Sequence, residues 1–187
     1  MISGLIAGIQ RSKVMGMYGN FKAVTPEELD KFLSCSTTEE ISALLYIDQE
    51  LDTSGDYLEI EKKWQGLHFL LTGSADGGTP PLSWCVFGNH SIGGDEKPIF
   101  FGWIGIRYLL PNEVRQVTQA LSETSHEVLA SRYSPRDMDQ QEVYPIGIWE
   151  RDGDSGLDYI LCCYPAVVSF YQKAAFQNKA MLMYITS

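Results

Sequence analysis

The sequence predicts an α+β fold in a single domain, with a small mixed sheet packed with about six helices, one of them central and buried. The chain has 187 residues, which is enough for one sizeable core and too few for two ordinary domains. Segments expected to be strands lie near both ends of the chain, and several helix-capping motifs lie between them. One segment in the first half is apolar almost all round, as expected of a helix inside the core.

Threonine caps define the first two helices. Residues 15–24, MGMYGNFKAV, are expected to form a strand in which two glycines allow close backbone approach. Thr25 and Glu28 have the spacing of a capping box, with a proline at the first helical position, and predict a helix over 26–34. A second helix, capped by a threonine of STTEE, is predicted to run to about residue 50.

A third helix is predicted over residues 58–72, and this is the one we place at the centre of the core. Four of its apolar residues fall on one stripe: Ile60, Trp64, Leu67 and Leu71. Phe69 and Leu70 lie off that stripe, so the second half of the helix is apolar on nearly every side. Gly73 is the expected C-terminal stop.

The second half of the chain mixes extended and helical segments. PLSWCVFG is either a single helical turn or a short strand. The other expected elements are a strand over 99–110, helices over 111–122, over 125–132 and after a cap at Ser134, an extended EVYPIGIWE segment, and a closing strand over 180–186. Pro165 must kink or split the long helical stretch before the closing strand, because proline lacks the amide donor.

The chain is acidic, with a formal net charge of −10. Such a surface repels phosphate backbones and anionic lipids, so neither nucleic acid nor a membrane is an expected partner. A basic protein partner would be attracted, and its encounter would be faster. Solubility alone is the alternative explanation of the charge, and the sequence does not set the oligomeric state.

Motifs for cofactors, metals and covalent catalysis are missing from the sequence. The glycines of TGSADGG follow a helix, whereas phosphate-binding glycines precede one, so no nucleotide cofactor is expected. Neither a GxSxG elbow nor CxxC or HExxH spacing occurs, so we expect no such nucleophile and no metal site. The four cysteines are expected to be reduced thiols in a cytoplasmic protein. Residues 1–14 are interpreted as an N-terminal extension to a domain spanning 15–187.

The candidate ligand site is a pocket wall around His68. Glu61 and Trp64 precede His68 at helical spacing, so that the carboxylate could raise the pKa of the imidazole or fix its tautomer, while the indole shields both groups. His68 would then serve as an acid, a base or a hydrogen-bond donor. The alternative is architectural, namely a buried histidine bonded to a backbone carbonyl or to a tyrosine hydroxyl.

Four further residues are candidates for the lining of this site. Arg107 and Tyr108 end a predicted strand, where the cation could point into a crevice or form an ion pair with an acidic residue. Tyr144 and Trp149 flank the proline of EVYPIGIW, where aromatic side chains could form a recognition surface or cover the core. No catalytic residue is assigned.

Several segments resemble the YfbM-like proteins, a bacterial family of unknown function. They are MGMYGNF, TPEEL, KKWQGLHFLLTG, VFGNHSIG, RYLLPNEV, SRYSPRDMDQQEVYP and FYQKAAFQNKAMLMYI. The resemblance runs in one order from Met15 to Tyr184, and W-x-x-L-H-F-x-L-T-G is its most specific block. It implies a small cytosolic α+β protein without an established activity. By analogy with relatives encoded beside toxin genes, it also suggests an immunity role.

Two functional hypotheses follow. The first is a non-enzymatic protein-binding module, with an immunity protein against a basic toxin domain as a special case. The second is a small-molecule-binding protein or hydrolase with a pocket around His68. We favour the first because the sequence contains no nucleophile or cofactor motif.

Overall fold

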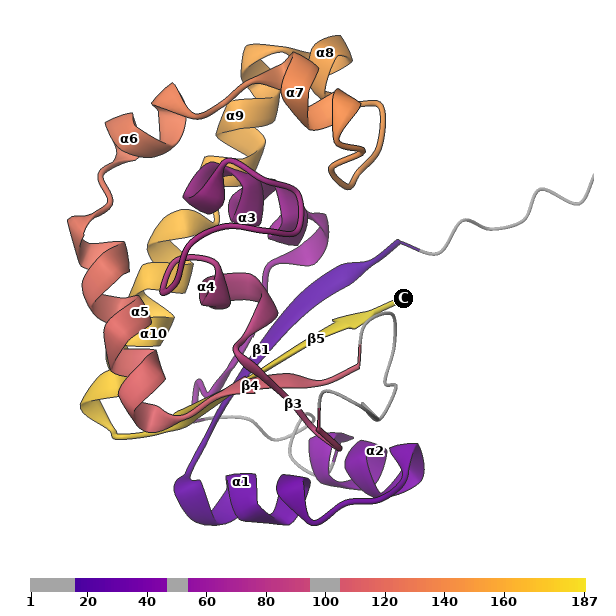
Figure 1. Cartoon of the computed structure of the whole chain (residues 1–187), viewed down its shortest axis with the longest axis vertical. Helices are drawn as coiled ribbons and strands as arrows, with labels where there is room; N and C mark the ends of the chain where they lie inside the picture. The colour runs from indigo at the N-terminus through magenta and orange to yellow at the C-terminus, as the bar shows by residue number, and fades with distance from the viewer. Residues whose placement is uncertain (1–15, 47–53, 95–104) are drawn as a thin grey trace, which may run out of the picture.

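A five-stranded antiparallel sheet lies at the centre of the part of the chain that the structure describes (Figure 1). The structure is a computed structural model, and it describes residues 16–46, 54–94 and 105–187. The strands, in the spatial order β2-β1-β5-β4-β3, are β1 (Tyr18–Val24), β2 (Tyr57–Glu59), β3 (His90–Ser91), β4 (Arg107–Leu109) and β5 (Ala180–Thr186). β5 pairs with β1 along its whole length and with β4 on its other side. The first and last strands in the sequence therefore form the middle of the sheet.

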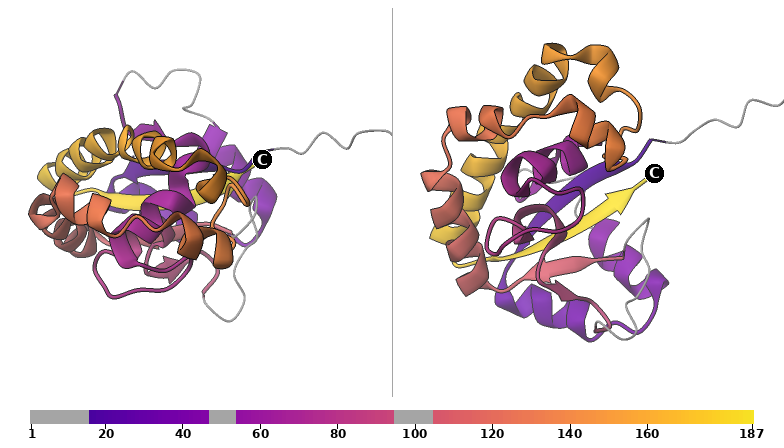
Figure 2. Two further views of the ribbon diagram at one scale, coloured as in Figure 1. Left: turned by 90° about the horizontal axis from the view of Figure 1, so that it is seen from above. Right: turned by 45° about the horizontal axis from the view of Figure 1, so that its top comes forward.

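Helices cover both faces of this sheet (Figures 1 and 2). They are α1 (Pro26–Leu33), α2 (Thr38–Tyr46), α3 (Trp64–Thr72), α4 (Trp84–Phe87), α5 (Pro111–Glu123), α6 (His126–Ser131), α7 (Pro135–Gln140), α8 (Trp149–Asp152), α9 (Asp154–Leu161) and α10 (Tyr164–Phe176), with a 3-10 turn η2 (Glu61–Lys63) before α3. α1 and α2 pack on one face, and α3, α5 and α10 pack on the other. The predicted α+β class is confirmed.

The side chains of β5 alternate between two hydrophobic cores, as successive residues of a strand must. One core lies under α1 and α2 and includes Ala180, Leu182 and Tyr184. The larger core lies under α3, α5 and α10 and includes Met181, Met183 and Ile185. All six side chains are at most 2% exposed, so β5 is buried on both faces.

The predicted central helix is confirmed as α3, but it begins later than expected. All residues of α3 from Trp64 to Leu71 are buried except Gln65, and Gly73 ends the helix with a φ of 77°. The first part of the predicted segment 58–72 is wrong, because β2 pairs with β1 and Glu61 has a φ of 52°. A positive φ at a glutamate interrupts a helix.

Other expectations also need correction. The sheet is antiparallel in every described pairing and not mixed. The described residues form more helices than the six expected, because the helical stretches divide into short pieces. EVYPIGIWE is not an extended strand, since residues 143–148 form a loop and α8 begins at Trp149. Parts of two predicted elements, 47–50 and 99–104, lie outside the described residues, as does the predicted extension 1–14.

The predicted helix ends are confirmed where a cap or a proline sets them. Thr25 and Glu28 form both bonds of the capping box at α1. The Ser134 hydroxyl accepts from the Asp137 amide at the start of α7. Pro165 separates α9 from α10 by lying in the first turn of α10, where its missing amide proton costs nothing. None of the described helices has the length and apolar character needed to cross a membrane.

Candidate functional site

His68 lies inside the core on α3, and its side chain is 0% exposed. Its Nε2 donates to the Gly77 carbonyl oxygen at 2.8 Å, because a carbonyl can only accept. Nδ1 therefore has no proton in the neutral ring, and it has no hydrogen-bonding partner among the described residues. Burial lowers the pKa of His68 to about 4, although the bond to Gly77 opposes this shift. The imidazole is neutral at pH 7 and ties α3 to the glycine-rich loop that follows it.

Trp64 and Tyr144 lie beside this histidine in an aromatic cluster. Their rings stack with centroids 5.7 Å apart and planes inclined by 20°. The Phe87 ring lies 4.4 Å from the His68 ring and 6.0 Å from the Trp64 ring, measured between centroids. Met17 joins the two stacked residues, because its amide donates to the Tyr144 hydroxyl at 2.9 Å and its carbonyl accepts from the Trp64 indole at 3.3 Å. The structure thus brings three predicted site residues together, at positions that pack against one another.

Two other predicted site residues, Trp149 and Glu61, are placed differently. The Trp149 indole is fully buried over Gly66 and donates to the Val143 carbonyl at 2.7 Å. Glu61 does not share a helix face with His68, since it precedes α3, and its carboxylate pairs with Lys63 instead. The expectation that Glu61 raises the pKa of His68 is therefore wrong. The cause is the interrupted backbone at Glu61, which turns its side chain towards solvent.

A groove of about 550 Å³ lies elsewhere, along the exposed face of α5. It is lined by Pro81, Asn112, Arg115, Gln116, Gln119, Ala120 and Glu123. None of these residues belongs to the predicted pocket. A ligand site around His68 stays a prediction, and the burial of that side chain agrees with the architectural alternative.

Arg107 and Tyr108 belong to a second, polar cluster at the edge of the sheet formed by β3 and β4. The Arg107 guanidinium donates from Nε to the Phe87 carbonyl at 2.9 Å and from Nη2 to the Asn89 carbonyl at 3.3 Å, and from Nη1 to the Ser91 hydroxyl. These bonds fix the backbone between α4 and β3. The Tyr108 ring stacks on His90, its cross-strand partner, with centroids 5.0 Å apart.

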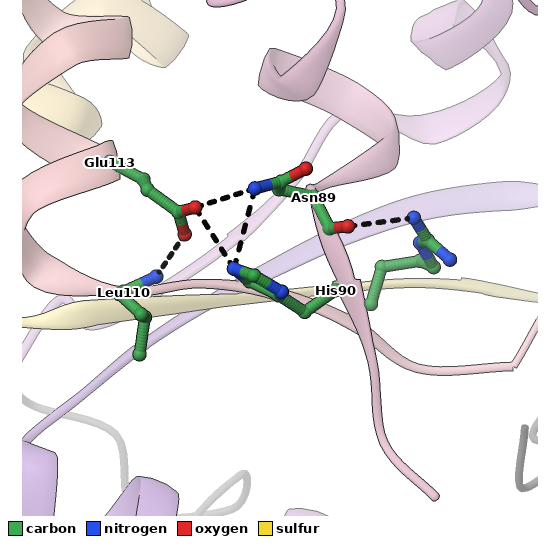
Figure 3. Close-up of polar contacts among 5 residues, drawn as sticks. Asn89, His90, Leu110 and Glu113 are labelled. Atoms are coloured by element: carbon green, nitrogen blue, oxygen red, sulfur yellow. Dashed lines mark hydrogen bonds and ion pairs between the residues drawn. The ribbon is translucent and has the colours of Figure 1, made fainter. Parts of the chain in front are cut away.

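Glu113 is the centre of this polar cluster (Figure 3). Its side chain is 9% exposed. Oε1 accepts from Asn89 Nδ2 at 2.6 Å and from His90 Nε2 at 2.9 Å, and Oε2 accepts from the Leu110 amide at 2.8 Å. Burial raises the pKa of Glu113, but the three hydrogen bonds outweigh this effect and hold the pKa below its usual value. The carboxylate is ionised at neutral pH and holds the imidazole of His90 in place.

Asn89, His90 and Glu113 were not predicted from the sequence as a site. Two local signals were available, namely the adjacent Asn89 and His90, and Glu113 at the third position of a helix that begins with proline. Neither signal shows that the two segments meet. Among the described residues, no group of three or more histidine, cysteine or acidic side chains could hold a metal ion.

An acidic surface segment, residues 134–161, comprises α7, α8 and α9. It carries seven carboxylates and two arginines. The loop 143–148 within it exposes Ile146, whose side chain is 64% accessible. Asp139 of α7 accepts from the amides of Trp149 and Glu150, which ties α8 to α7 and closes the base of this loop.

Comparison with known proteins decides the family. The family model of the domain of unknown function DUF1877 matches residues 15–184. The chain belongs to this family. It is 29% identical to protein YfbM of Escherichia coli strain K12 over 136 residues, which cover 70% of this chain and 74% of that protein. The DUF1877 assignment and this relative confirm the resemblance to YfbM-like proteins.

A solved structure of a YfbM protein shows the same fold. The crystal structure of YfbM from Escherichia coli, a protein of unknown function, matches with a TM-score of 0.69 at 23% identity. The match covers 90% of this chain and 99% of that one. At this identity the likeness establishes a shared fold and nothing about activity.

Proposed function

We propose that this protein is a protein-binding module whose partner presents a basic surface. The observation that carries the proposal is Ile146, a large apolar side chain that is 64% exposed in the middle of the acidic segment 134–161. Interfaces are typically anchored by a few apolar or aromatic side chains with a polar rim around them. Ile146 would be such an anchor.

The loop that carries Ile146 is held rigidly on both sides. Val143 is fully buried, and its amide donates to the Met138 carbonyl at 2.9 Å. The Tyr144 amide donates to the Gln65 side chain at 2.8 Å. Trp149, on the other side, is fully buried. An anchor that is already ordered loses little conformational entropy on binding, which favours affinity.

The charge of segment 134–161 also favours a basic partner. Seven carboxylates against two arginines in segment 134–161 attract a cationic partner and repel an anionic one. A toxin domain that acts on nucleic acid has a cationic surface, so an immunity protein is one form that this function could take. The alternative, a small-molecule or hydrolase pocket around His68, is less well supported, because that side chain is 0% exposed.

Affinity capture from a lysate of the host organism tests the proposal. The immobilised protein is expected to retain a basic protein at low salt and to release it at about 1 M salt, where the Debye length falls to about 3 Å. Ile146→Ser should weaken the purified pair at least about tenfold, as expected for an interface anchor. Titration calorimetry measures this change. If the partner is a toxin, the wild-type protein should also inhibit its activity.

A matched control is available at the other end of the molecule. Phe176, the last residue of α10, is 92% exposed. The end of α10 that leads into β5 lies on the opposite side of the described chain from α7 and α8 (Figure 1). Phe176→Ser removes a comparable apolar side chain and should leave the affinity unchanged. The proposal is wrong if no basic partner is retained, if binding is insensitive to salt, or if Phe176→Ser and Ile146→Ser weaken binding equally.

A further inference from the structure

His90 and His68 each have one ring nitrogen in a hydrogen bond, but the His90 side chain is partly exposed whereas His68 is buried. The Nε2 of His90 lies 2.9 Å from Glu113 Oε1, and the His90 side chain is 36% exposed. An ionised carboxylate only accepts hydrogen bonds, so Nε2 carries the proton. Asn89 Nδ2, which lies 3.3 Å from Nε2, then donates to Glu113 Oε1 and not to the ring. The lone pair of the neutral ring is then on Nδ1, on the side away from Glu113 (Figure 3). No described residue forms a hydrogen bond with Nδ1.

The surroundings hold this ring in one orientation. Tyr108 stacks on one face at 5.0 Å. Asn89 Nδ2 binds the same carboxylate oxygen as His90, at 2.6 Å. Arg107 fixes the backbone carbonyls of Phe87 and Asn89 that lead into β3. A carboxylate that orients a partly exposed imidazole, whose second nitrogen has no hydrogen-bonding partner among the described residues, is the arrangement that enzymes use for proton transfer.

We propose that His90 is a general base that activates water for the hydrolysis of small, uncharged carboxylic esters. This inference goes beyond the proposed binding function and does not depend on it. Water is the nucleophile because the neighbouring hydroxyl of Ser91 is engaged by Arg107. The substrate is uncharged because Glu113 and a net charge of −10 disfavour anions at this edge of the sheet.

The reaction balances with the residues at hand. Nδ1 takes a proton from water as the water oxygen bonds to the ester carbonyl carbon. The bond from that carbon to the alcohol oxygen then breaks, and the imidazolium returns the proton to the departing alkoxide. The products are a carboxylic acid and an alcohol. Glu113 stays ionised throughout as a positioning residue that stabilises the imidazolium.

Hydrolysis of p-nitrophenyl acetate by the full-length protein tests the proposal. His90→Gln should lower the second-order rate constant at least about tenfold, at the low end of what a positioned base contributes. Glutamine keeps an amide that can donate to Glu113, so this variant should fold, and circular dichroism checks that it does. His126→Gln is the matched control, because His126 is an exposed histidine at the start of α6, and it should hydrolyse the ester at the wild-type rate.

Glu113→Gln tests the positioning role separately. We expect the rate constant to fall several-fold and the nitrogen-15 NMR spectrum of His90 to change from a single Nε2–H tautomer to a mixture, because a glutamine amide can both donate and accept. A merely structural role of Glu113 would leave the tautomer unchanged in the folded variant. Equal rates for wild type and His90→Gln, or an equal loss in His126→Gln, would overturn the proposal.

Discussion

The Trp64 indole stacks on the Tyr144 ring at 5.7 Å, and this contact joins the central helix to the loop that exposes Ile146. The two residues are also bridged by Met17, which donates to Tyr144 and accepts from Trp64. Both hydrogen bonds involve the backbone of Met17, so the start of the described chain is attached to the same cluster. The presentation of the loop therefore depends on packing within the core.

Two substitutions of Tyr144 separate the contribution of its hydroxyl to stability from the contribution of its ring. Tyr144→Phe removes the acceptor of the Met17 amide and should lower the free energy of unfolding by about 1 kcal/mol. Tyr144→Ala also removes the stacked ring and should lower it by about 3 kcal/mol in total. Urea unfolding measures both values. Equal losses in the two variants would show that the stacking contributes nothing to stability.

Gly66 on α3 is predicted to tolerate no side chain. A Cβ at this position would lie 2.9 Å from Ile160 and 3.0 Å from the Trp149 ring. Gly66→Ala should gain about 1 kcal/mol of helix propensity, but overpacking of about 1–3 kcal/mol outweighs that gain, so a net loss of stability is expected. Ile160→Val relieves part of this overpacking, because it removes Cδ1, one of the two Ile160 atoms that would lie 2.9 Å from the new Cβ. The double variant should then be more stable than the sum of the two single changes predicts, and additive changes would contradict the packing argument.

Helix ends were predictable from the sequence because their causes are local. The capping box of α1 involves residues three positions apart, and the division at Pro165 follows from a missing amide proton. The start of the third helix was not predictable in this way. Residues 57–59 join the sheet because β1 offers them a pairing edge, with Leu58 opposite Phe21, and no pattern within the segment reveals that edge.

Replacing Thr25 tests whether the capping box stabilises the start of α1. Its hydroxyl accepts from the Glu28 amide at 3.2 Å, so Thr25→Ala leaves an amide of the first turn without its partner. We expect a loss of about 1 kcal/mol in the free energy of unfolding. Thr25→Ser keeps the hydroxyl and should stay within a few tenths of a kcal/mol of the wild type. Guanidinium unfolding curves of the two variants distinguish these outcomes.

The two clusters differ in how far the sequence could predict them. Trp64 and His68 share a helix, so their proximity follows from helical spacing, whereas their contact with Tyr144 depends on tertiary packing. The cluster of His90 and Glu113 depends on strand register, because His90 lies opposite Tyr108 and the chain then turns directly into α5. Register across an edge of a sheet is set by distant residues, which explains why the sequence suggested Arg107 and Tyr108 but missed their neighbours.

The stability of the protein should depend on the protonation of His68. Burial lowers the pKa of His68 from 6.5 to about 4 in the folded state. The unfolded chain then binds a proton more readily than the folded protein does, so stability is fully present above pH 6.5 and falls as the pH drops towards 4. Over this window the loss should amount to about 3 kcal/mol, at up to about 1.4 kcal/mol per pH unit.

His68→Gln isolates this contribution, because glutamine can still donate to Gly77 and does not titrate. The difference in the free energy of unfolding between wild type and variant should shrink by about 3 kcal/mol between pH 7 and pH 4. Acidic groups that titrate in both proteins cancel in this difference. Urea unfolding at pH 7, 6, 5 and 4 provides the measurement, and His126→Gln should follow the wild-type curve. Parallel curves for wild type and His68→Gln would mean that the buried imidazole accepts its proton without disturbing the core.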